Sequence, residues 1–149
     1  MANSDWLVSR WMSKKVYTVV PSDRLVDAFE IMQERRIRHI PVVEKGKLVG
    51  IISDRDVRIY LPTRVHLEGA SSAYSKTLMQ TTIKSVLKSK PITVSSASTI
   101  REAAEIMCRE KVGALPVVDD AKLVGIVSAE DVLWAFVDNI QNLRDAWEM

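Results

Sequence analysis

Residues 47–57 read Lys-Leu-Val-Gly-Ile-Ile-Ser-Asp-Arg-Asp-Val, and residues 122–132 read Lys-Leu-Val-Gly-Ile-Val-Ser-Ala-Glu-Asp-Val. The two stretches align without a gap at a distance of 75 residues, and the match extends outward over about 15–60 and 90–135. An ungapped match of this length indicates that one structural unit is written twice.

Each copy predicts the same succession of elements, β-α-β-β-α. A short β-rich stretch precedes a helix whose apolar side chains recur at helical spacing. Two apolar runs around a tight polar turn then predict a β-hairpin, and a second helix follows it. The first helix, the turn and the start of the second helix are predicted at 25–32, 44–47 and Ser53 in copy one, and at 100–107, 119–122 and Ser128 in copy two. Asp23 and Ser98 are the predicted N-caps of the first helices.

The strands are nearly continuous apolar runs, which need cover on both faces. One unit of about 45 residues is too small to supply that cover. We therefore expect an α/β (α+β) fold in which tandem β-α-β-β-α repeats pack sheet to sheet with pseudo-twofold symmetry and a cleft on each side of the axis. The expected boundaries are a first repeat at 8–62, a linker at 63–82, a second repeat at 83–140 and a C-terminal helical tail at 141–149.

The composition narrows the class of protein. Among 149 residues, 21 Lys and Arg face 19 Asp and Glu, a balance too even to favour nucleic acid as a partner. The first residues lack the apolar run of a signal peptide, and no apolar stretch is long enough to span a membrane. Cys108 is the single cysteine, so no disulfide can form within the chain, and we expect a reducing, cytoplasmic setting. The Cys108 side chain itself is expected to be a small packed thiol.

The sequence contains no candidate residues for a catalytic site or a metal site. It contains no nucleophile–base pair, no His–carboxylate cluster and no Gly-rich phosphate loop. His66 has no second histidine or cysteine at the spacing of a metal ligand. We therefore expect neither an enzyme nor a metal protein.

Ser53 and Asp56 stand where the second helix begins, and Ser128 and Asp131 repeat them. One interpretation is helix capping, in which the serine caps and the aspartate lies near the positive helix end. The other is ligand binding, because a helix N-terminus attracts phosphate and an ionised aspartate accepts hydrogen bonds from two vicinal ribose hydroxyls. The residues alone leave both interpretations open.

The tandem pattern Thr-Val, Pro-Val-Val and Leu-Val-Gly-Ile-x-Ser-x-x-Asp-Val resembles a pair of CBS domains (a Bateman module) from about Ser9 to Asn139. Stand-alone pairs associated with acetoin utilisation are the most similar, since they share the Ser-Asp-Arg-Asp-Val-Arg segment and a long connection like 62–82. The resemblance implies a homodimeric regulatory module without a cofactor. Its implied ligand is AMP, ADP, ATP or S-adenosylmethionine, and it would pass the binding state to a regulated protein.

The resemblance also implies two clefts, each assembled from both repeats. In the first, Asp56 would bind the ribose hydroxyls and Ser53 the ribose-phosphate region. Its remaining residues would be Thr93, Val112, Gly113 and Ala114 around the adenine and Arg38, His39 and Arg55 near the phosphates. The second would use Asp131 and Ser128, with Thr18 and Ile37 on the base side.

The two implied clefts would differ in charge. Gly113, Ala114 and Glu130 stand where the first cleft has Arg38, His39 and Arg55. A carboxylate in that place disfavours a phosphate by about 1–3 kcal/mol. We therefore predict that the Asp56 cleft takes the phosphorylated ligand and the Asp131 cleft is empty, weak or selective for a less anionic adenosine compound. The simpler alternative for the basic run at 35–39 is a solvated helix end.

The last helix carries an approximate apolar stripe. Its members are Trp134, Val137, Ile140, Leu143 or Arg144, and Trp147. Core packing against the N-terminal helix is the first interpretation, and a dimer or partner surface is the second. The rival functions are a scaffold protein with vestigial clefts, a sensor of S-adenosylmethionine or NAD(H), and an enzyme.

Overall fold

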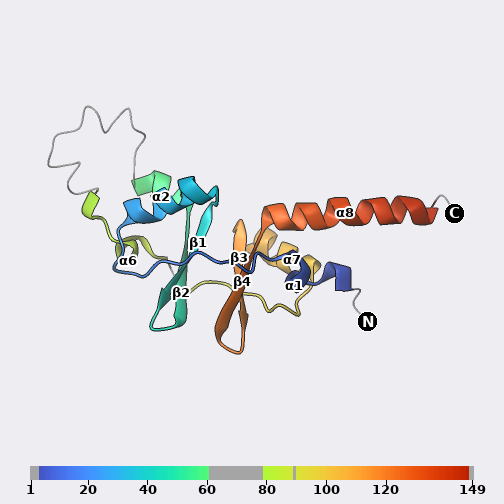
Figure 1. Ribbon diagram of the computed structural model, residues 1–149, viewed down its shortest axis with the longest axis horizontal. Helices are drawn as coiled ribbons and strands as arrows, with labels where there is room; N and C mark the ends of the chain where they lie inside the picture. Colours follow the sequence, from blue (N-terminus) through green and yellow to red (C-terminus); the bar gives the residue numbers. More distant parts are fainter. Residues whose placement is uncertain (1–3, 61–78, 89, 148–149) are drawn as a thin grey trace. The chain divides into compact units, whose positions relative to one another are not determined.

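The structure is a computed structural model that describes residues 4–60, 79–88 and 90–147 (Figure 1). It divides into two compact units. The first-repeat unit is Tyr17–Pro91, and the second-repeat unit combines Met1–Val16 with Ile92–Met149. His66 and the predicted linker up to residue 78 lie outside the described residues.

The first helix, the hairpin and the second helix follow the predicted order in both units, whereas the predicted first strand of each repeat is reduced to a single β-bridge, at Val19 and at Val94. The first-repeat unit contains α2 (Leu25–Arg35), β1 (His39–Glu44), β2 (Lys47–Ser53), α3 (Asp54–Tyr60) and α6 (Ile83–Val86). The second-repeat unit contains η1 (Ser4–Trp6), α1 (Val8–Trp11), α7 (Ile100–Glu110), β3 (Ala114–Asp119), β4 (Lys122–Ser128) and α8 (Ala129–Trp147). The bounds of α7, β3 and β4 repeat those of α2, β1 and β2 at the distance of 75, so the duplicated α+β architecture is confirmed.

Each unit has an antiparallel hairpin, β1–β2 or β3–β4, extended at one edge by a parallel bridge. Val19 forms this bridge with Val42, and Val94 forms it with Val117. The hairpin turns place two successive residues at positive φ. Such turns match the twist of the flanking strands.

The helices bury the predicted apolar positions. α2 buries Leu25, Ala28 and Met32, and α7 buries the equivalent set at 100, 103 and 107. Cys108 is one position beyond the buried Met107, which turns it about 100° away from the core. Cys108 is therefore exposed, and the predicted packed thiol is wrong.

The N-caps lie one residue later than predicted. The N-cap of α7 is Thr99 rather than Ser98, because Glu102 completes a capping box with it. The Thr99 side chain accepts from the Glu102 N–H, and the Glu102 carboxylate accepts from the Thr99 N–H. In the first repeat, Arg24 occupies the cap position of α2, and the Asp23 carboxylate instead accepts from the Val20 N–H at 2.9 Å in the turn before it.

Each unit includes the segment that precedes the other repeat. Val8 of α1 is fully buried in the second-repeat core, in one cluster with Ile100 and Leu115. Ile83 and Val86 of α6 are buried in the first-repeat core. We call α1 and α6, with the residues just after them, the exchanged segments.

The exchanged segments explain the glycine of the quoted motif. A Cβ on Gly50 would lie 2.5 Å from Cδ2 of Leu87. A Cβ on Gly125 would lie 2.6 Å from Sδ of Met12 and 3.0 Å from the backbone oxygen of Ser13. Glycine in the middle of β2 and β4 therefore makes room for an exchanged segment.

The apolar stripe on α8 does not pack as first interpreted. Ala135 and Asn139 take the buried face, while Trp134 and Val137 are 59% and 55% exposed. Ile140 is half-buried, and the side chains beyond it lie outside the described residues. The core-packing interpretation is therefore wrong for Trp134 and Val137. Within the described ranges, neither α8 nor any other helix is long and apolar enough to cross a membrane.

Candidate functional site

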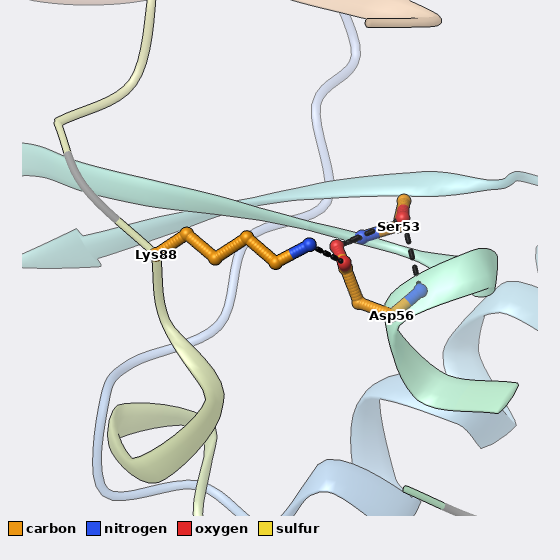
Figure 2. A network of polar contacts seen from close by, with 3 residues as sticks. All are labelled: Ser53, Asp56 and Lys88. Carbon is orange, nitrogen blue, oxygen red and sulfur yellow. Dashed lines mark hydrogen bonds and ion pairs between the residues drawn. The ribbon is translucent and has the colours of Figure 1, made fainter. Parts of the chain in front are cut away.

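Ser53 and Asp56 form a compact polar network at the junction of β2 and α3 (Figure 2). The Ser53 N–H and hydroxyl both donate to Oδ2 of Asp56, at 3.0 and 2.8 Å. In return, the Asp56 N–H donates to the Ser53 hydroxyl oxygen at 3.1 Å. This reciprocal arrangement confirms the capping interpretation, and it fixes the carboxylate at the end of the strand.

Lys88 completes the network from the other side. Figure 2 shows its side chain reaching from the segment after α6 towards Asp56. Its ammonium donates to Oδ1 of Asp56 at 3.0 Å, so both carboxylate oxygens are engaged. The Lys88 side chain is 75% exposed and that of Asp56 only 17%.

The sequence interpretation missed Lys88. The equivalent position in the other copy, 75 residues earlier, is Ser13, so the repeat itself gives no sign of a cation here. The available signal is the glycine of β2. Gly50 admits Leu87 against the strand, and Leu87 brings its neighbour Lys88 to the strand end.

Asp56 is a strong anionic acceptor. Burial alone would raise the pKa of its carboxyl, but the hydrogen bonds from Ser53 and the hydrogen bond and charge of Lys88 outweigh it. The pKa of Asp56 is therefore lowered from its ordinary value. The carboxylate is ionised throughout the physiological pH range.

The second repeat contains the same network without the lysine. The Ser128 N–H and hydroxyl donate to Oδ2 of Asp131 at 2.7 and 3.0 Å, and the Asp131 N–H donates back to the hydroxyl oxygen at 3.2 Å. Among the residues that the structure describes, none donates to Oδ1 of Asp131. Ser13, which corresponds to Lys88, instead pairs through its backbone with Ile126.

His39 lies beside the Asp56 network because β1 pairs with β2 in a register that sets it opposite Ser53. Burial lowers the pKa of His39, the charge of Arg38 acts in the same direction, and Asp54 and Asp56 oppose them. The imidazole is therefore neutral at pH 7. Arg38 and Arg55 are exposed.

The corresponding positions of the second repeat carry no cation. Ala114 pairs with Ser128 as His39 pairs with Ser53. The Gly113 carbonyl accepts from the Ala129 N–H at 2.9 Å, and that of Arg38 accepts from the Asp54 N–H at 2.8 Å. The two backbones therefore match, while the side chains differ.

The residues predicted for each cleft are divided between the two units. Ser53, Asp56, Arg38, His39 and Arg55 belong to the first-repeat unit, whereas Thr93, Val112, Gly113 and Ala114 belong to the second-repeat unit. Ser128 and Asp131 likewise belong to the second-repeat unit, and Thr18 and Ile37 to the first. The assembly of each set into one cleft stays a prediction.

Thr93 is exposed and lines a surface hollow of about 540 Å³ within the second-repeat unit. The hollow lies beside α7, whose Glu102, Glu105 and Arg109 also line it. Ser128 and Asp131 are not among its lining residues. The hollow is therefore distinct from the network around Asp131.

Comparison with known proteins assigns the family. The family model of the CBS domain matches residues 8–63 and 83–138. A CBS domain-containing protein of Dictyostelium discoideum is 33% identical over 129 residues, which cover 85% of this chain and 88% of that protein. Some other curated relatives are longer, and the chain spans 47% of one and 25% of another.

Solved structures of CBS pairs have the same fold. The Vibrio cholerae protein assigned to acetoin utilization (AcuB) superposes with a TM-score of 0.71 at 27% identity, over 93% of this chain and 96% of that one. CBSX2 in complex with AMP gives 0.71 at 28% identity, over 89% and 97%. The CBS domain pair of protein MJ0100, in complex with 5-methylthioadenosine and S-adenosyl-L-methionine, gives 0.70 at 29% identity, over 87% and 98%. The chain belongs to the CBS domain family and contains two CBS domains in tandem, as the stand-alone pairs to which it is similar do.

Proposed function

We propose that this protein is a non-catalytic regulatory module that binds an adenosine nucleotide of the AMP, ADP and ATP class and transmits its binding to a partner protein. The observation that carries the proposal is the Ser53–Asp56 network, a fixed, ionised carboxylate that recurs in the second repeat. The AMP bound to CBSX2 and the adenosine compounds bound to MJ0100 support the ligand class.

In the proposed complex, the Asp56 carboxylate accepts hydrogen bonds from the ribose hydroxyls, and Ser53 holds the carboxylate in place. Arg38 and Arg55 supply positive charge for the phosphate, and neutral His39 supplies a hydrogen-bond donor. Ligand that contacts both repeats would favour one packing of the repeats over another, and the partner would respond to that change.

The test is a ligand panel on the wild-type protein and the variants Asp56→Ala and Asp131→Ala. AMP, ADP, ATP, S-adenosylmethionine and NADH are each added at millimolar concentration while thermal unfolding is followed. A ligand whose Kd is a hundredth of its concentration stabilises the folded state by about 2.7 kcal/mol. We expect a shift with at least one adenosine nucleotide, lost in Asp56→Ala and largely kept in Asp131→Ala.

Two other results would change the proposal. Equal losses in both variants would contradict the predicted difference between the two sites. No shift with any adenosine compound would contradict the sensor and favour a scaffold protein. Circular dichroism of each variant shows whether a loss of binding reflects a loss of folding.

The proposal includes a homodimer in the cytoplasm. Ile59 on α3 and Trp134 on α8 are equivalent positions of the two repeats and are 63% and 59% exposed. Leu133, Phe136 and Val137 extend the exposed apolar surface on α8. Apolar surface of this kind is stabilised by a second protein surface. Light scattering should give the mass of a dimer, and a monomer at high concentration would contradict this part of the proposal.

A further inference from the structure

We propose that Lys88 selects the ligand of the Asp56 site by its charge. In the free protein the ammonium holds Oδ1 of Asp56, and in the complex it moves to an anionic group at the 5′ position of the ligand. The site then prefers nucleotides with a 5′-phosphate over neutral adenosine and over cationic S-adenosylmethionine. This inference rests on the proposed function, and it decides between ligands that the function alone leaves equivalent.

The contacts of Asp56 place Lys88 in competition with a ribose. Oδ2 already accepts two hydrogen bonds from Ser53, at 3.0 and 2.8 Å. Oδ1 accepts only from Lys88, at 3.0 Å, among the described residues. A ribose whose two hydroxyls donate to this carboxylate needs the oxygen that the ammonium holds. Ribose binding therefore displaces Lys88 or weakens its contact.

The ion pair is placed so that Lys88 is easily displaced. The Lys88 side chain is 75% exposed, and ion pairs of exposed lysines contribute little to stability because water solvates the free ammonium well. The backbone beside it stays in place, because Leu87 packs against Gly50 and its N–H donates to the Ile83 carbonyl at 3.1 Å. Only the flexible side chain has to move.

The ligand determines what the displaced ammonium meets. The 5′ substituent sits on the same ring as the two hydroxyls, so it lies within the swing of a lysine side chain anchored beside Asp56. A phosphate there accepts a charge-assisted hydrogen bond from Lys88. A neutral substituent leaves the ammonium without a counter-charge, and a sulfonium repels it.

The second repeat provides the internal comparison. Its Asp131 has the same three contacts with Ser128, but Ser13 stands in the place of Lys88. The selection by charge is therefore a property of the Asp56 site alone. This difference is independent of Arg55 and Glu130, which lie on the second helices.

The test compares Lys88→Met with the matched control Lys84→Met, both in an Asp131→Ala background that removes the second site. Lys84 is also exposed and lies on α6 of the same exchanged segment, and no ion pair connects it to another described residue. Isothermal titration calorimetry gives the Kd of AMP, adenosine and S-adenosylmethionine for each protein. Lys88→Arg, which keeps the charge, serves as the rescue.

We expect Lys88→Met to weaken AMP about tenfold, the size of effect usual for one charge-assisted hydrogen bond. Adenosine should bind unchanged or more tightly, and S-adenosylmethionine more tightly, so the ratio of the adenosine and AMP Kd values falls at least tenfold. Lys84→Met and Lys88→Arg should keep the wild-type ratio.

An unchanged ratio in a Lys88→Met protein that still binds AMP would overturn the role of Lys88 and leave the proposed function standing. A fall of the same size in Lys84→Met would also overturn it, because the effect would then be one of net charge. If AMP, adenosine and S-adenosylmethionine all fail to bind the Asp131→Ala protein, the role of Lys88 is overturned, and the proposed function is overturned as well if ADP and ATP also fail to bind it.

Discussion

His39 couples the candidate site to the stability of the fold. It is the first residue of β1, it lies opposite Ser53, and burial lowers the pKa of its imidazole. In the unfolded chain the pKa of a histidine is about 6.5. Between the lowered pKa and that value, the unfolded chain binds a proton that the folded protein does not. Stability therefore rises with pH through this window and falls on acidification.

The variant His39→Gln should lose part of this pH dependence. Glutamine keeps a hydrogen-bonding side chain at this position but does not titrate. Urea unfolding at pH 7.5 and 5.5 measures the free energy of unfolding of both proteins. We expect the wild-type protein to lose more stability than the variant between the two values, and His66 is common to both. The same loss in both proteins would show that burial of His39 does not affect its protonation.

One pair of equivalent positions in the two hairpin turns, 46 and 121, allows a test of backbone strain. Gly46 in the first turn has φ of 76°, and Ala121 in the second has φ of 64°. A residue with a Cβ is disfavoured in this region, whereas glycine is not. A Cβ built on Gly46 meets nothing within 4 Å, so packing does not complicate the comparison at that turn.

Exchanging the two residue types should change stability in opposite directions. Ala121→Gly should stabilise the protein by about 0.5–1 kcal/mol, because relief of strain exceeds the added freedom of the unfolded chain. Gly46→Ala should destabilise it by a similar amount. Chemical denaturation measures both, and a change of the same sign in the two variants would contradict the assignment to backbone strain.

The sequence predicts those elements whose signal is local. Apolar spacing alone predicts α2 and α7, and the turn residues predict both hairpins. The cap of α7 was misplaced because Ser98 and Thr99 are adjacent hydroxyl residues, and only the carboxylate of Glu102 distinguishes them. Capping at Ser53 was predictable because the serine and aspartate lie three residues apart.

Contacts between distant segments were not predictable in the same way. Lys88 reaches Asp56 across 32 residues, and nothing in the repeat pattern pairs them. On α8, apolar side chains occur on more than one face, so the sequence does not say that Ala135 rather than Trp134 turns to the core. Each of these outcomes depends on which other segment packs there.

At the scale of the whole molecule, the order of the chain differs from the order of its packing. Val8 is buried with Ile100 and Leu115, which are more than 90 residues away in the sequence. Ile83 is buried in the core of the first repeat. A change in one exchanged segment therefore acts on the repeat that it packs against.

The variant Val8→Ala should loosen the second-repeat unit. Val8 is fully buried, so the loss of its two methyl groups should lower the free energy of unfolding by about 2 kcal/mol. Hydrogen exchange followed by mass spectrometry should show faster exchange in β3, β4 and α7, with β1 and β2 unchanged. Ile83→Ala is the reciprocal control and should loosen β1 and β2. Faster exchange in the first repeat for Val8→Ala would contradict the packing.

The exchanged segments also determine when each unit can complete its folding during synthesis on the ribosome. The first-repeat unit is one uninterrupted stretch, Tyr17–Pro91, and has all its parts once that stretch has emerged. Val8 and its neighbours Trp6 and Trp11 wait until the second repeat has been made. At roughly 5–20 residues per second, translation from residue 17 to the end of β4 takes on the order of 6–22 s. For that time an apolar, tryptophan-bearing segment has no partner of its own, and it is then that a chaperone or a second nascent chain has the opportunity to bind it.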